Sequence, residues 1–251
     1  MQTKIYTLIL LLIGLNVAPL VAQDPVEILR KSEEVRRGTE SAQAEMTMTI
    51  VRPSWKRSMS LKTWSKGEEN ALILVTAPAR DKGMSTLKIE RDVWNYMPSI
   101  GRTVKLSRSM MSQSWMGSDF TNNDLVQEVS VIYDYDHKIL GEKEIEGRKC
   151  WIMELVPHAD VAVVWGKVVI HIDQEDYLQM RSEFYDEDGY LVNVMQASDI
   201  KQMGGHTVAT RLEMIPVEED GHKTVMEYQS LKFDADIDPT FFSVQNMKRV
   251  R

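Results

Sequence analysis

The sequence contains a single cysteine, Cys150, among 251 residues. One thiol can form neither an internal disulfide nor a cysteine-rich zinc site, so a packed core must stabilise the chain. Positive charge is not in excess either, since 37 acidic residues outnumber 30 lysines and arginines and give a net charge of −7. Nucleic-acid binding requires a basic surface, so no nucleic-acid partner is expected.

Motifs of catalysis and of metal binding are also missing from the sequence. It contains no Gly-x-Ser-x-Gly elbow, no His-Glu-x-x-His helix and no glycine-rich nucleotide loop. The five histidines are scattered singly, and His171-x-Asp173 alone has a spacing that a metal could use. We therefore expect no enzyme activity, no cofactor and no metal site.

A long hydrophobic run occurs at the amino terminus. Lys4 precedes an apolar run over residues 5–17, and the small residue Ala22 precedes Gln23. This order is typical of a secretory signal peptide, and the run is shorter than the ~20 residues of a membrane span. We expect cleavage after Ala22, export, and a single domain over residues 23–251 with no lipid anchor; an uncleaved amino-terminal anchor is the alternative.

The expected domain begins with a helix and continues as strands. Asp24 suits an N-cap, Pro25 the first helical position and Gly38 the residue beyond the end, which predicts a helix with a narrow apolar stripe. From Ala44 onward, apolar and polar residues alternate with a period of two, as in β-strands. Turn residues interrupt this alternation repeatedly, for example at Gly147 and Gly189.

This pattern predicts a mainly β (α+β) protein. About a dozen strands joined mostly by hairpins form one large antiparallel sheet, and a sheet of that size must curl and cover its concave face. The expected fold is thus a curved sheet or incomplete β-barrel covered by the N-terminal helix and by an irregular segment, residues 107–126.

The segment 107–126, here called the lid, sets large apolar side chains among small polar ones without strand alternation. Thr121 and Asp124 are spaced as a capping box. Such a segment can be a functional lid over the hollow of the sheet, or it can simply fill that hollow as core. The sequence leaves both alternatives open.

A resemblance rests on residues 93–125. They read Val93-Trp94-Asn95-Tyr96-Met97-Pro98, then Arg102 and Lys105-Leu106, then Ser114-Trp115-Met116-Gly117-Ser118-Asp119-Phe120-Thr121 and Asp124-Leu125. In order and residue type this resembles the signature of the LolA-like family of outer membrane lipoprotein-sorting proteins.

The resemblance implies an incomplete antiparallel barrel whose hollow holds acyl chains. It implies a non-catalytic periplasmic carrier that moves a lipid or lipoprotein toward the outer membrane. The implied partners are those acyl chains, together with an inner-membrane exporter and an outer-membrane acceptor.

Large apolar residues of the signature and the lid are the candidate lipid contacts, because flexible methionines and aromatic rings can adapt to acyl chains. They are Trp94, Tyr96, Met110, Met111, Trp115, Met116, Phe120 and Leu125. A basic strip, Arg102, Lys105 and Arg108, is a candidate contact for an anionic head group or an acidic partner, or else a solvated sheet edge.

Two other functions remain open from the sequence. The same fold could act as an envelope sensor that binds a partner protein instead of carrying cargo. Methionine pairs such as Met46 and Met48 could bind copper(I), since thioethers are soft ligands, although core packing explains them equally well.

Overall fold

The structure, a computed structural model, describes residues 24–38, 40–126, 130–159, 161 and 163–250. The expected signal peptide, residues 1–22, lies outside the described residues. Within the described part of the chain, no helix is long and apolar enough to cross a membrane.

The N-terminal helix α1 spans Pro25–Arg37, as the sequence predicts. The Asp24 carboxylate accepts a hydrogen bond from the Val26 amide at 3.0 Å and caps the first turn. At the other end Gly38 has φ 76°, a conformation that favours glycine. Ile28 and Leu29 are buried against the sheet, so the predicted apolar stripe is confirmed.

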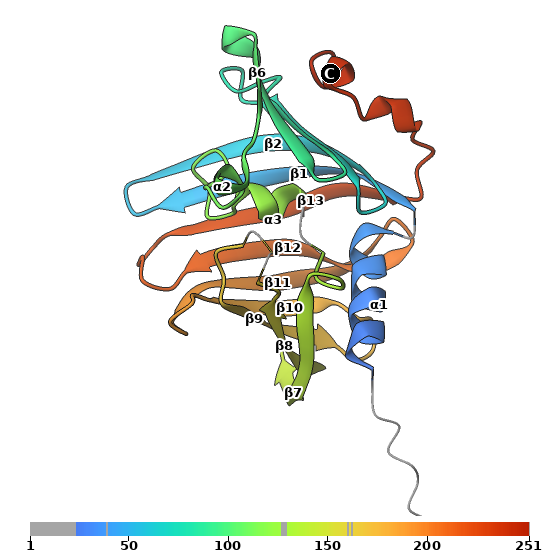
Figure 1. Cartoon of the computed structure of the whole chain (residues 1–251), viewed down its shortest axis with the longest axis vertical. Helices are drawn as coiled ribbons and strands as arrows, with labels where there is room; N and C mark the ends of the chain where they lie inside the picture. The colour runs from blue at the N-terminus through green and yellow to red at the C-terminus, as the bar shows by residue number, and fades with distance from the viewer. Residues whose placement is uncertain (1–23, 39, 127–129, 160, 162, 251) are drawn as a thin grey trace, which may run out of the picture.

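Thirteen antiparallel strands in the described residues form one curved, unclosed sheet, which confirms the predicted fold class (Figure 1). The strands are β1 Ser41–Arg52, β2 Trp55–Lys66, β3 Asn70–Ala77, β4 Ser85–Ile89, β5 Asp92–Met97, β6 Arg102–Lys105, β7 Tyr135–Ile145, β8 Arg148–Pro157, β9 Lys167–Asp173, β10 Gln179–Tyr185, β11 Leu191–Met203, β12 His206–Pro216 and β13 Lys223–Phe233.

The strand order is β6-β5-β4-β3-β2-β1-β13-β12-β11-β10-β9-β8-β7. The first wing, β1 to β6, ends at one edge of the sheet, and the chain then crosses to the opposite edge to begin β7. The second wing returns strand by strand until β13 pairs with β1, with Ala42 opposite Phe233. The crossing segment contains the lid, which therefore lies between the two edges of the sheet (Figure 1).

The inner face of the sheet carries two apolar clusters. In β1 the alternating residues Ala44, Met46, Met48 and Ile50 are buried, as their spacing predicts. They pack beneath the lid, whose short helices are α2 Arg108–Met111 and α3 Asn122–Val126. The second wing forms its own inner cluster under α1, so both expected covers lie on this face.

The outer face of the first wing has a cover that the sequence did not predict. Residues 234–250, here called the strap, include η2 Pro239–Phe241 and α4 Val244–Met247. The strap packs Phe242 and Met247 against Leu72 and Leu87 of the sheet. Its backbone is held by side chains of the sheet: Ser41 Oγ donates to the Ala235 carbonyl at 2.6 Å, and Lys66 Nζ donates to the Ile237 carbonyl at 2.7 Å.

Candidate functional site

A cavity of about 290 Å³ lies between the inner face of the sheet, α1 and α3. It is roughly twice the size of the ~150 Å³ apolar cavity in which a protein can hold a benzene molecule. Both wings contribute to its wall, because the curvature of the sheet brings β8 to β10 around toward β1 to β3. The cavity is therefore the hollow that a curled sheet of this size is expected to enclose.

Most of the cavity wall is apolar and flexible. Its methionines come from strands of both wings, namely Met46, Met195, Met214 and Met226. At one end the rings of Trp165 and Phe184 lie 5.2 Å apart, measured between centroids. Methionine side chains can rearrange around apolar ligands of different shape, which suits a cavity for acyl chains.

A polar part of the wall comes from α1. Ser32, Glu33 and Arg36 lie on the side of the helix that faces the cavity. Glu33 is buried, and its Oε1 accepts a hydrogen bond from Arg36 Nε at 3.2 Å. This pair puts a compensated charge at the edge of a mostly apolar space.

Asp124 of α3 also borders the cavity. Burial raises the pKa of its carboxyl group, and hydrogen bonds from Thr121 oppose that rise. Burial and the nearby Asp124 carboxylate together raise the pKa of Tyr135 to about 12. The Tyr135 hydroxyl therefore stays neutral, whereas an ionised Asp124 is held there at a cost.

The outer half of the lid is a tight, self-bonded loop. The Trp115 amide donates to the Phe120 carbonyl at 2.8 Å, and the Ser118 amide donates to the Trp115 carbonyl at 2.9 Å. Met116 and Gly117, at the tip, have φ values of 51° and 78°. The loop closes in this way because glycine accepts the left-handed conformation. It presents Trp115 and Phe120 to the inner face, each only 3% exposed.

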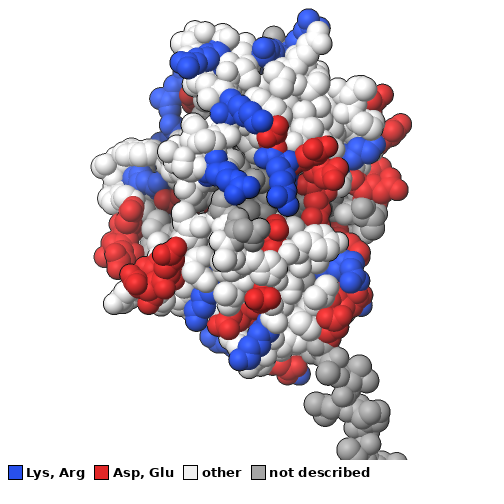
Figure 2. Space-filling model, viewed as in Figure 1, with Lys and Arg blue, Asp and Glu red and all other residues white. Residues whose placement is uncertain are grey.

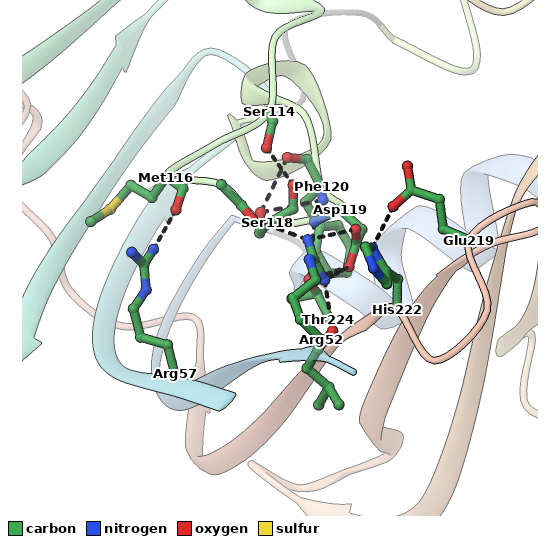
Figure 3. Close-up of polar contacts among 12 residues, drawn as sticks. Arg52, Arg57, Ser114, Met116, Ser118, Asp119, Phe120, Glu219, His222 and Thr224 are labelled. Atoms are coloured by element: carbon green, nitrogen blue, oxygen red, sulfur yellow. Dashed lines mark hydrogen bonds and ion pairs between the residues drawn. The ribbon is translucent and has the colours of Figure 1, made fainter. Parts of the chain in front are cut away.

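A largely buried ion pair fixes this loop to the centre of the sheet (Figure 3). Arg52, at the end of β1, donates to both carboxylate oxygens of Asp119, at 2.9 and 3.0 Å. Thr224 of β13 donates to the same carboxylate at 2.6 Å. The side chains of Arg52 and Asp119 are 13% and 7% exposed. We call this Arg52–Asp119 pair the latch, since a desolvated bidentate pair holds one geometry.

The lid residues predicted from the sequence all pack onto the inner cluster beneath the lid, and they are Met110, Met111, Trp115, Met116, Phe120 and Leu125. Two of them, Phe120 and Leu125, reach the cavity wall. Trp115 is fixed in the core instead, where its Nε1 donates to Thr86 Oγ1 at 3.1 Å. The lid therefore combines both alternatives of the sequence: part of it is core, and part of it borders a space.

Trp94 and Tyr96 are not brought to the cavity. They project from β5 on the outer face and pack under the strap with Trp64. Their strand neighbour Val93 faces inward and is 2% exposed. The structure thus separates these two residues from the other candidate lipid contacts by the full thickness of the sheet.

The three residues of the basic strip also differ in their contacts. Lys105 lies 2.6 Å from the Asp92 carboxylate and 5.6 Å from the Trp94 ring centroid. Arg102 and Arg108 are exposed. Of the three predicted head-group contacts, Lys105 already has a partner within the chain.

The sequence did not single out the methionines of the cavity wall as lipid contacts. Their signal was the period-two alternation of each strand, but alternation does not show which face is concave. The copper alternative concerned Met46 and Met48, which are 5% and 0% exposed and pack within the inner core.

Solved structures define the class of this fold. The chain superposes on a DUF1329 family protein from Desulfovibrio piger with a TM-score of 0.82 and 24% identity, covering 90% of this chain and 100% of that one. It superposes on a LolA superfamily protein from Nitrosomonas europaea with a TM-score of 0.76 and 25% identity, covering 89% and 99%. The chain has the LolA-like open-barrel fold, as its sequence signature suggests.

A third similar structure is a candidate outer membrane lipoprotein-sorting protein domain from Vibrio parahaemolyticus, with a TM-score of 0.80, 22% identity and coverage of 90% and 98%. The model of a family described as "Uncharacterized protein" matches residues 67–249, and the chain belongs to that family. Comparison with curated proteins gives no match.

Proposed function

We propose that this protein is an exported, non-catalytic carrier that holds acyl chains of a lipid or lipoprotein and moves them toward the outer membrane. The observation that carries the proposal is the apolar cavity of about 290 Å³ beneath a latched lid. An acyl chain in water costs ~0.8 kcal/mol for each methylene, so it needs such a shelter to cross an aqueous compartment.

The size of the cavity limits what it can hold. If ~150 Å³ suffices for the six carbons of benzene, the cavity has room for on the order of ten carbons without movement of the lid. A longer chain, or a second one, requires that α3 or α1 shift outward. Both helices border the cavity, so the proposed route of entry lies between them.

The descriptions of two similar structures support the proposed class of cargo. One belongs to the LolA superfamily and another is described as a lipoprotein-sorting domain. The proposed site comprises the cavity floor with Phe120 and Leu125 of the lid, while Trp94 and Tyr96 are left out because they lie on the outer face. Transfer would involve an exporter that loads the carrier and an acceptor that binds the cargo more tightly.

The proposal is tested by filling the cavity. Ala44→Phe directs a ring from β1 into the cavity, because Ala44 and Met46 both line its wall. It should lower the affinity for a fluorescent fatty acid about a hundredfold, because displacement of about four methylenes removes ~3 kcal/mol. Native mass spectrometry of the purified protein should show bound lipid in the wild type and less of it in the variant.

Two aromatic truncations make the test specific. Phe120→Ala removes a ring from the cavity wall and should weaken lipid binding more than folding, whereas the control Trp94→Ala removes one from the outer face and should leave binding unchanged. Equal loss of binding in both variants, or full binding by Ala44→Phe, would reject the cavity as the acyl site. Delivery of bound lipid to acceptor vesicles then distinguishes a carrier from a sensor.

A further inference from the structure

One end of the molecule carries exposed cations from three separate segments. Lys82 belongs to the β3–β4 loop, Arg102 begins β6, and Lys248 and Arg249 follow α4. We call these four residues the basic pole. No ion pair within the described residues involves any of them, whereas most of the acidic residues visible in Figure 2 lie away from this end.

Direct contacts place the three segments together. A Cβ added at Gly83, next to Lys82, would lie 3.4 Å from Pro98 of η1 Pro98–Ile100. Arg102 pairs with Met97 just before that turn. Ser85 of β4 donates to the Met247 carbonyl at 3.0 Å, which ties the end of the strap to the same region.

An apolar residue occupies the tip of this end. The β5–β6 hairpin projects beyond the rest of the sheet (Figure 1), and η1 forms its turn. Ile100, the last residue of η1, is 65% exposed, although large aliphatic residues are usually buried. The tip therefore presents one apolar side chain, and the neighbouring segments carry cations.

The charge of this end contrasts with that of the whole protein. The chain has a net charge of −7, yet the acid nearest to Lys82 in sequence, Asp81, is already paired with Arg80 at 3.1 Å. At physiological ionic strength charges are screened over about 8 Å, so an approaching surface responds to the pole and not to the distant carboxylates. The protein thus has a basic end although its net charge is negative.

We propose that the basic pole docks the protein on an anionic phospholipid surface, with Ile100 at the point of contact. The cations lie on the projecting hairpin and on two segments in contact with its base, so one extended surface can meet all three segments at once. Cations near an anionic membrane are attracted to its surface, and an apolar residue can enter the interfacial region. The docking surface goes beyond the proposed function, because it does not require a lipid in the cavity.

The experiment measures co-sedimentation of the protein with vesicles made of equal parts phosphatidylglycerol and phosphatidylcholine, and with pure phosphatidylcholine. The wild type should bind the anionic vesicles, and binding should weaken with salt. Lys248→Gln/Arg249→Gln should reduce binding about twenty-five-fold, since each cation near such a surface contributes roughly fivefold. Ile100→Ser, made in the wild type, should also reduce binding to the anionic vesicles, although it leaves the charge unchanged.

The matched control is Lys138→Gln/Lys143→Gln, which removes the same charge from β7 at the opposite edge of the sheet. It should bind the anionic vesicles as the wild type does. Absence of binding by the wild type, or equal losses in the two double variants, would overturn the proposal and leave an acidic protein surface as the alternative partner.

The result is separable from that of the carrier proposal. Ala44→Phe should dock on vesicles normally although its cavity is filled, and the pole variants should retain lipid in native mass spectra. If only Ala44→Phe loses bound lipid in native mass spectra, the cavity is the acyl site. If only the pole variants lose binding to anionic vesicles, the docking proposal stands whatever the cargo.

Discussion

The two faces of the first wing are both rich in aromatic and aliphatic residues, and the cavity beneath the lid lies against the inner one. On the outer face Trp64 and Phe241 lie with ring centroids 5.3 Å apart, and the strap fills the surface with its own apolar side chains. On the inner face the lid is fixed at its rim by the polar latch and leaves a space beside Phe120. The segment that covers a face, strap or lid, therefore determines whether its apolar surface becomes core or a binding site. The composition of the face does not.

The largest effect on stability is expected on the outer face, which the strap covers. Phe242→Ala should destabilise the protein by about 3–5 kcal/mol, because Phe242 is 5% exposed and nothing replaces its ring. Its Tm should fall by on the order of 10 °C. Lipid binding, measured below that Tm, should be unchanged. Reduced binding at an unchanged Tm would mean that the strap also covers a ligand site, and the contrast between the faces would be lost.

A smaller effect on global stability is expected from the latch. Asp119→Ala leaves the Arg52 guanidinium buried without its carboxylate, which costs about 3 kcal/mol in comparable pairs. The cost should appear as local opening of the lid, seen as faster hydrogen exchange over residues 114–121 and faster lipid release. The control Asp81→Ala breaks the Arg80–Asp81 pair, whose arginine is 63% exposed, and should cost less than ~1 kcal/mol. Equal exchange rates in the two variants would show that the latch does not hold the lid.

The smallest effect concerns the charge at the cavity wall. The folded-state pKa of Asp124 is raised by burial, so its contribution to stability is full below the unfolded pKa and is lost as pH rises through the folded pKa. Asp124→Asn should therefore be more thermostable than the wild type at neutral pH, and the difference should shrink on acidification. A constant difference in Tm across that range would contradict the assignment of the effect to this carboxyl group.

Much of the fold could be predicted because it is local. The cap at Asp24, the stop at Gly38, the turns at Gly147 and Gly189 and the capping pair of Thr121 with Asp124 all depend on neighbouring residues, and the structure contains each of them. The strand alternation of β1 likewise predicts which of its residues are buried.

The arrangement of the site depends on distant residues and could not be predicted. Trp94 and Val93 are both apolar and point to opposite faces, and the sequence does not reveal which face is concave. The latch joins Arg52 to Asp119, and the strap meets the first wing only because β13 returns to β1. A strap of scattered apolar residues has no period that would predict its cover of the outer face.

The pairing of β13 with β1 has a consequence for the order of folding. The first strand lacks one neighbour until the last strand has been made, so the middle of the sheet closes through contacts between chain segments far apart in sequence, which form slowly. A chain cut before residue 223 would expose the edges of β1 and β12 at its centre, and such open edges favour aggregation. The architecture thus makes assembly all-or-none: a partly synthesised copy has no finished half that could fold and act on its own.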